Sequence, residues 1–120
     1  AYEIVSRDWS SDVCSSDLYL GDDTPGDVTK LHFPSFSSEV VSFLIQERGV
    51  RMIGVDTASI DYGQSQDFIV HRLVGAANVP ALENLSDLEK LPATGATIVA
   101  LPMKIGQGSG APTRVIAFYP

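Results

Sequence analysis

Residues Ser37–Arg48 and Arg51–Val55 constrain the fold most, because they predict a helix, a turn and a buried strand in direct succession. Ser37 suits the N-terminal cap of the helix, and Gly49 suits the stop after its last turn. The apolar side chains that recur at helical spacing are Val40, Val41, Phe43 and Leu44. Helix, glycine turn and strand in this order indicate an α/β fold.

The remaining segments continue this mixed pattern. We expect a second helix over Asp67–Val74, a short strand over Val79–Leu82 and one or two helical turns over Leu85–Leu91. Ala96–Met103 and Thr113–Tyr119 are the clearest strands, because β-branched residues fill them and Gly and Pro bound them. The glycine-rich stretch between these two strands predicts a hairpin loop.

Length and charge exclude several classes of protein. A chain of 120 residues has room for one small domain. Its formal net charge of −7 argues against nonspecific binding to nucleic acid or to an anionic membrane. No apolar run reaches the roughly 20 residues that a membrane span needs. With a single cysteine no internal disulfide can form, so we expect a cytoplasmic protein.

Residues Ala1–Leu18 differ in character from the rest of the chain. They are rich in Ser and Asp and show no regular apolar period. Asp8–Leu18 can be back-translated in one frame to a common sequencing-library adapter. We therefore interpret residues 1–18 as adapter-derived and exclude them from the fold. Trp9 and Cys14 then carry no functional weight, and the evolved part of the chain is Tyr19–Pro120.

His71 and Glu83 are the main candidates for metal ligands. Imidazole nitrogen and carboxylate oxygen both bind zinc and other borderline divalent ions. Twelve positions separate the two residues, too many for one helix face, so they can act together only by meeting across two elements. A metal site needs three or four protein ligands, and the spacing alone is a weak signal. The competing interpretation is a structural histidine and a paired carboxylate.

A second polar group follows the predicted strand that ends near Val55. Ligands of α/β proteins gather beyond the carboxyl ends of strands, so these side chains are candidates for contact with a substrate. The alternative is local turn chemistry, in which short polar side chains bond to neighbouring backbone. The candidates are Asp56, Thr57, Ser59 and Asp61.

The whole stretch Tyr19–Pro120 resembles the metal-dependent cyclase family, which includes bacterial kynurenine formamidases and isatin hydrolases. The matching pieces, in order, are LHFPSFS, ERGVRMIGVDTASID, SQDFIVHR, LENLSDLEKLPATGATIVALPMKI and GSGAPTRVIA. The resemblance implies the C-terminal part of a swivelling β/β/α domain. It also implies a parent protein that is a homo-oligomer and acts on a small molecule.

The same resemblance implies hydrolysis of amide or lactam C–N bonds with zinc or manganese. N-formylkynurenine is the first substrate expected and isatin the second, which makes arylformamidase the leading activity. By alignment with the family, His71 and Glu83 are its later metal positions. The family motif HxGTHxDxPxH, which carries most of the ligands and a general base, is absent from this sequence.

This absence leaves no confident catalytic residue in the chain. We expect the 120-residue chain by itself to be an inactive fragment with exposed apolar surface. The alternatives to an enzyme fragment are a noncatalytic module that binds a small ligand and a plain structural domain. Replacement of His71 and Glu83 in a longer protein separates these cases.

Overall fold

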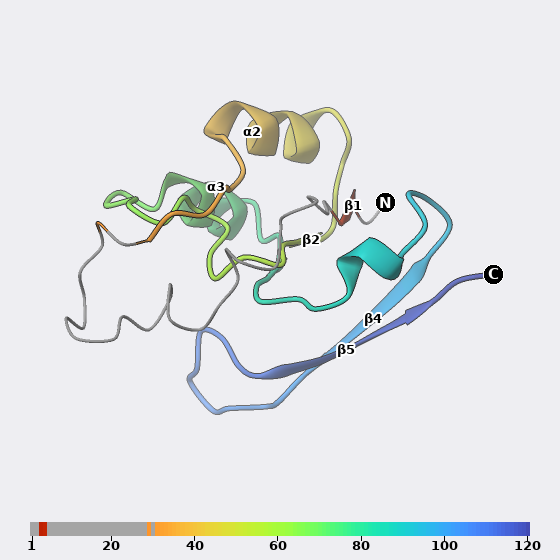
Figure 1. Ribbon diagram of the computed structural model, residues 1–120. Coiled ribbons are helices and arrows are strands. Elements are labelled where there is room, and N and C mark those ends of the chain that lie inside the picture. Colours follow the sequence, from red (N-terminus) through yellow and green to blue (C-terminus); the bar gives the residue numbers. More distant parts are fainter. Residues whose placement is uncertain (1–2, 5–28, 30) are drawn as a thin grey trace. The chain divides into compact units, whose positions relative to one another are not determined.

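The computed structural model describes residues 3–4, 29 and 31–120 (Figure 1). These residues form two compact units, Ala1–Leu88 and Glu89–Pro120. Most of the adapter-like segment and nearly all of the acidic stretch before Leu31 lie outside the described residues. Within the described part the chain is a mixture of helices and strands, in agreement with the predicted α/β class.

The first helix, α2 (Ser38–Gln46), forms where the sequence predicts it. The Ser37 hydroxyl accepts a hydrogen bond from the Val40 amide at 3.3 Å, and Gly49 takes the left-handed conformation after the helix (φ 60°). Of the four apolar residues at helical spacing, Val41 and Leu44 are buried. Val40 and Phe43 are 46% and 52% exposed, so only part of the apolar side of the helix faces the core.

The sheet of the first unit is parallel, in the order β1 (Glu3–Ile4), β2 (Ile53–Gly54), β3 (Ala81–Leu82). Helix α3 (Ile69–Ala76) connects β2 to β3. The strands are shorter than predicted, but the pairing of β2 with β3 extends beyond them. The Val55 amide donates to the Leu82 carbonyl at 2.9 Å, and the Leu85 amide to the Val55 carbonyl at 3.0 Å.

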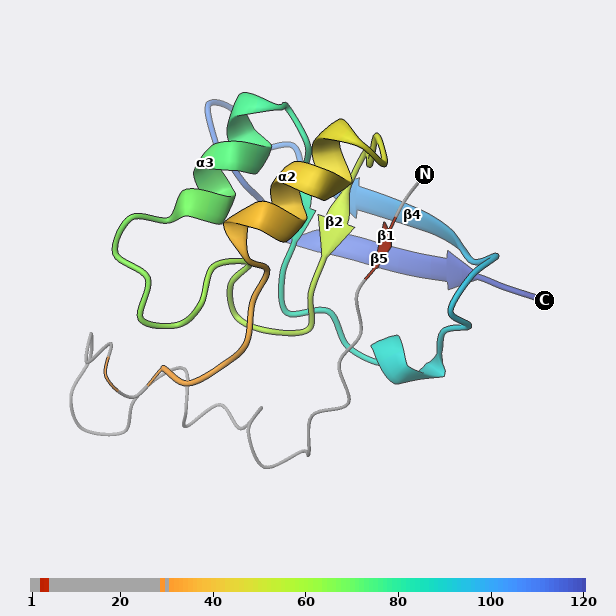
Figure 2. The ribbon, with the colours of Figure 1, turned by 90° about the horizontal axis from the view of Figure 1, so that it is seen from above.

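One core holds this unit together. Helices α2 and α3 lie side by side and pack against each other (Figures 1 and 2). The core combines buried side chains from both helices, from β2 and from the segments around them: Phe36, Val41, Leu44, Val50, Ile53, Val55, Ile60, Val70, Val74 and Val79. Burial of this apolar surface is the main stabilising contribution to the unit.

Strand β1 falls inside the segment that we expected to take no part in the fold. Its pairing with β2 is a difference from that expectation. The physical reason is that pairing uses backbone groups alone, so the open edge of a strand can accept almost any extended segment. The pairing therefore does not test the origin of residues 1–18.

The second unit is built on an antiparallel hairpin of β4 (Thr97–Pro102) and β5 (Thr113–Phe118). Both strands and the loop between them agree with the prediction. Ahead of the hairpin, the expected turn over Leu85–Leu91 is a single 3-10 turn, η2 (Leu88–Lys90). No helix among the described residues is long and apolar enough to cross a membrane.

One face of the hairpin is largely apolar, with Thr97 and Arg114 as its polar members. The directly paired residues Val99 and Ile116 share that face, and so do Leu101 and Arg114. Leu101, Ile116 and Phe118 are all exposed. An exposed apolar face of this kind favours association with other protein surfaces.

We expect the purified chain to self-associate through this face. Replacement of Ile116 and Phe118 by Lys should lower the sedimentation-derived average mass toward that of a monomer. A matched double change of Glu89 and Lys104, which are exposed outside the two strands, to Gln should leave association unchanged. If the unmodified chain sediments as a monomer at all concentrations, this prediction fails.

A second prediction concerns Gly63 in the loop after β2. A Cβ atom at this position would lie 2.3 Å from the Leu31 carbonyl oxygen, which is backbone and cannot simply rotate away. The change Gly63→Ala should therefore lower the free energy of unfolding by about 1–3 kcal/mol.

The control is Gly75 in α3, where an added Cβ would meet nothing within 4 Å. Gly75→Ala should raise the free energy of unfolding by up to about 1 kcal/mol, because Ala favours helix over Gly. Urea denaturation of both variants measures the difference. Equal effects of the two changes would contradict the packing described for Gly63.

Candidate functional site

The candidate site lies beyond the carboxyl ends of β2 and β3. Because these strands are parallel neighbours, the residues that follow them emerge at the same edge of the sheet. The loop 55–68 follows β2 and leads into α3, and Glu83 comes directly after β3. This topology brings together the loop, the first turn of α3 and Glu83.

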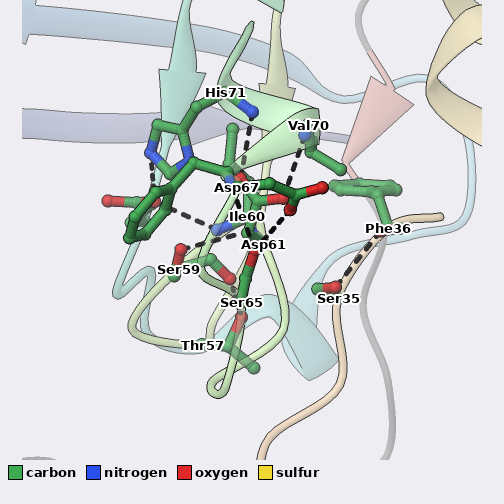
Figure 3. Close-up of polar contacts among 12 residues, drawn as sticks. Ser35, Phe36, Thr57, Ser59, Ile60, Asp61, Ser65, Asp67, Val70 and His71 are labelled. Carbon is green, nitrogen blue, oxygen red and sulfur yellow. Dashed lines mark hydrogen bonds and ion pairs between the residues drawn. The ribbon is translucent and has the colours of Figure 1, made fainter. Parts of the chain in front are cut away.

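Asp61 is the most buried polar residue of this region, with 1% of its surface exposed. One carboxylate oxygen, Oδ1, accepts from the Val70 amide at 2.9 Å, and Oδ2 accepts from the His71 amide at 3.0 Å. Oδ2 also lies 2.7 Å from Nδ1 of the His71 ring (Figure 3). A single buried carboxylate thus holds both the start of α3 and the imidazole.

These bonds replace an ordinary helix cap. Phe68 occupies the capping position of α3 but makes no side-chain cap bond. The first amides of a helix have no partner within the helix, and here Asp61 supplies one from the preceding loop. The Ser65 hydroxyl accepts from the Phe68 amide at 3.2 Å and donates to Asp67. The entry to α3 is therefore fixed by polar side chains on both sides.

The electrostatics of Asp61 follow from this surrounding. Burial by itself raises the pKa of Asp61, but the bonds from the His71 ring and from the Val70 and His71 amides outweigh it. The pKa of Asp61 therefore lies below the usual aspartate value, and the side chain is an anion at neutral pH.

His71 and Glu83 meet, as the sequence requires of two residues that act together. Nε2 of His71 lies 3.3 Å from Oε1 of Glu83. The same Oε1 accepts from the Ile60 amide at 3.0 Å, which fixes Glu83 against the loop. Side chains of both residues remain partly open to solvent, at 44% and 31%. Asp61, His71 and Glu83 form a carboxylate–imidazole–carboxylate row.

This row determines which nitrogen of His71 is available. A carboxylate can only accept, so Nδ1 carries the hydrogen that Asp61 binds. In the neutral ring Nε2 is then an acceptor that faces a second acceptor, Glu83. The approach of two acceptor atoms to 3.3 Å is favourable when a proton or a cation lies between them.

The distance between these two atoms fits a shared metal ion. Two donors bound at about 2.1 Å to one tetrahedral zinc lie about 3.4 Å apart. A histidine ligand whose other nitrogen donates to a carboxylate is also the usual arrangement around bound metal. The described residues contain no group of three or more His, Cys, Asp or Glu side chains that could hold an ion. They supply two side chains that could bind an ion, His71 and Glu83, and the buried carboxylate of Asp61 bonded to the other ring nitrogen of His71.

The substrate-side candidates make local hydrogen bonds. Thr57 is buried, and its hydroxyl donates to the Ser59 carbonyl at 2.9 Å. The Ser59 hydroxyl accepts from the Asp61 amide at 3.1 Å. These contacts are the local turn chemistry that we weighed against substrate contact. Asp56 is partly exposed beside them. The carboxylate of Asp61 is bonded to the His71 ring and to the first turn of α3.

Two features of the site could not be read from the sequence. It offered Asp61 as a candidate for substrate contact, but the spacing gave no sign of the bonds from Asp61 to amides nine and ten residues ahead in α3. It also did not single out Phe68, whose ring packs edge-to-face against His71 with centroids 6.1 Å apart. Its position directly before a predicted helix with a histidine in the first turn is the only signal available.

No family model matches the chain. Among curated proteins, the isatin hydrolase of Roseibium aggregatum is 30% identical over 121 residues, 98% of this chain and 44% of that protein. The kynurenine formamidase of Sphingopyxis alaskensis is 40% identical over 68 residues, 57% of this chain and 32% of that protein. The chain is homologous to cyclase-family hydrolases.

Solved structures agree with this relationship. Isatin hydrolase A from Ralstonia solanacearum has a TM-score of 0.70 and 38% identity, over 80% of this chain and 41% of that one. An isatin hydrolase bound to the product analogue thioisatinate has a TM-score of 0.68 and 32% identity, over 72% and 34%. The chain spans less than half the length of these homologues. Their shared hydrolase fold supports the predicted cyclase-like architecture.

The geometry of Asp61 gives a testable prediction. Neutral His71 should carry its hydrogen on Nδ1, which long-range ¹H–¹⁵N correlation spectra report directly. The only other histidine, exposed His32, can be assigned through His32→Gln. In Asp61→Asn the amide can point its NH₂ at the ring, so the Nδ1–H form should lose its preference. Asp67→Asn, at the same helix entry but without a bond to His71, is the control. A wild-type ring with hydrogen on Nε2 would refute the arrangement.

The same change should alter the response of stability to acid. A folded-state pKa below the unfolded value stabilises the protein above about pH 4, the ordinary aspartate pKa, and this contribution disappears as pH falls through the folded value. Asp61→Asn should lower the free energy of unfolding at pH 7 by about 1.5–3 kcal/mol. The difference in the free energy of unfolding between wild type and variant should become smaller in acid. Urea denaturation at several pH values measures it.

Proposed function

We propose that the chain is part of a metal-dependent hydrolase that cleaves the C–N bond of an aromatic amide or lactam. The observation that carries this proposal is the approach of His71 Nε2 and Glu83 Oε1 to 3.3 Å, with Asp61 bonded to the far side of the ring. Hydrolase homologues along the chain support the reaction class.

His71 and Glu83 are the residues that hold the divalent ion in this proposal, which is zinc or manganese. Such an ion polarises the carbonyl of a substrate and lowers the pKa of a bound water. The contribution of the chain is to present two donors in a fixed orientation. Asp61 keeps Nδ1 protonated and Nε2 free, and the Ile60 amide holds the Glu83 carboxylate in place.

Two donors are too few for a catalytic metal site. We propose that the other ligands come from residues outside this sequence, in the manner of the HxGTHxDxPxH motif. The length of the relatives supports this, since the chain covers 44% of the isatin hydrolase that it matches. In this proposal the chain is the C-terminal part of the enzyme. Residues 1–18 are adapter-derived in the proposal, although the alignment with isatin hydrolase extends into them, since it covers 98% of the chain.

The comparisons bear on the order of the two substrates. The alignment with isatin hydrolase covers 98% of the chain, and the alignments with kynurenine formamidases cover 57% to 63%. We therefore propose a cyclic amide of the isatin type as the first substrate. The open-chain amide N-formylkynurenine becomes the second, supported by the higher local identity of 40%.

The test compares the chain with a form extended upstream to the length of its relatives. The chain alone should show no turnover of isatin or N-formylkynurenine above background, because its site has two donors. The extended protein should bind one equivalent of metal and hydrolyse one of these compounds. Turnover by the purified 120-residue chain would contradict the incomplete site.

Single changes in the extended protein then test the two donors. His71→Gln and Glu83→Gln should each weaken metal binding by more than the roughly 10- to 100-fold that loss of an outer partner causes. His32→Gln and Glu89→Gln, at exposed positions, are the matched controls. If metal content and activity survive the first pair of changes, His71 and Glu83 do not hold the metal, and this part of the protein has a noncatalytic binding or structural role.

A further inference from the structure

Phe68 has an unfavourable backbone conformation for its residue type. Its φ of 48° and ψ of 46° lie in the left-handed region, which bulky side chains rarely occupy. The other non-glycine residues with positive φ in the described part are all polar: Asn78, Asn84, Asp87 and Gln107. Asn and Asp tolerate this region through local hydrogen bonds, which Phe cannot form. Some other interaction must favour an aromatic residue at this position.

Contacts within the fold supply only part of that interaction, through the edge-to-face packing of the Phe68 ring on His71. Phe68 is 52% exposed, so about half of its surface gains nothing from burial. Its side chain makes no cap bond to α3. Asn or Gly would give the same turn at lower conformational cost. Strain of this kind is characteristic of functional sites, where the side chain must occupy a particular place.

The place that Phe68 occupies is beside His71. The two rings meet edge-to-face, at an interplanar angle of 84°. The Ser65 hydroxyl accepts from the Phe68 amide, and the Arg72 amide donates to the Phe68 carbonyl at 3.0 Å. The backbone on both sides is thus held, and the half-open ring stands next to the His71–Glu83 pair.

We propose that Phe68 is a specificity-determining residue, whose ring contacts the planar aromatic part of the substrate while its amide lies at His71 and Glu83. The identity of the site as a hydrolase site rests on the proposed function. The aromatic preference rests on the strain, exposure and placement of Phe68. Aromatic rings attract one another in offset or edge-to-face arrangements beyond the burial of their area.

The test uses the 120-residue chain and two probes of similar size, benzamide and cyclohexanecarboxamide. Chemical-shift titration should show benzamide binding about 3- to 10-fold more tightly to the wild type. Phe68→Leu should abolish this ratio, and Phe68→Tyr should keep it. Phe43→Leu is the matched control, since Phe43 has the same 52% exposure on α2.

Phe68→Asn separates binding from folding. It should keep or raise the urea midpoint, because Asn suits the left-handed conformation, and still lose the preference for benzamide. An unchanged ratio in Phe68→Leu, or no binding of benzamide to the folded wild type, would overturn the proposal. Loss of metal binding on changing His71 or Glu83 is measured independently. Unchanged metal binding in the His71 and Glu83 variants would contradict the proposed hydrolase function. An unchanged benzamide ratio in Phe68→Leu would contradict the aromatic contact, so the two failures can be told apart.

Discussion

The rest of the site depends on the buried carboxylate of Asp61. An ionised group away from water is costly unless hydrogen bonds compensate it, and here three N–H groups do so. Two of them are helix amides that would otherwise lack partners. The third belongs to the His71 ring. Because one anion satisfies all three, the loop, the start of α3 and the orientation of the imidazole are fixed together.

The parallel pairing of β2 and β3 supplies the second half of the arrangement. It places Glu83 at the sheet edge where the loop after β2 emerges. The bond from the Ile60 amide to Glu83 then joins two segments 23 residues apart. A site whose members lie on different elements gains its geometry from the fold, and neither residue alone would indicate it.

The sequence predicted those parts that depend on local chemistry. The Ser37 cap and Gly49 stop marked α2 to within two residues, and the β-branched runs marked β4 and β5. It also required His71 and Glu83 to meet if they act together, and they do. What it could not give were contacts set by packing, such as the exposure of Val40 and Phe43 or the reach of Asp61 to α3. These depend on how elements are placed in space.

The hydrogen bonds that hold the site lie within one short part of the chain. This explains how part of the site can be well formed in a chain that spans less than half the length of its relatives. Asp61, His71 and Glu83 are held by bonds within residues 60–83, and those bonds do not require the remaining metal ligands. In the neutral ring Nε2 of His71 and Oε1 of Glu83 are both acceptors, so a proton or a cation between them favours their approach. The fold thus holds His71 and Glu83 in a fixed orientation that suits the metal-binding role proposed for them.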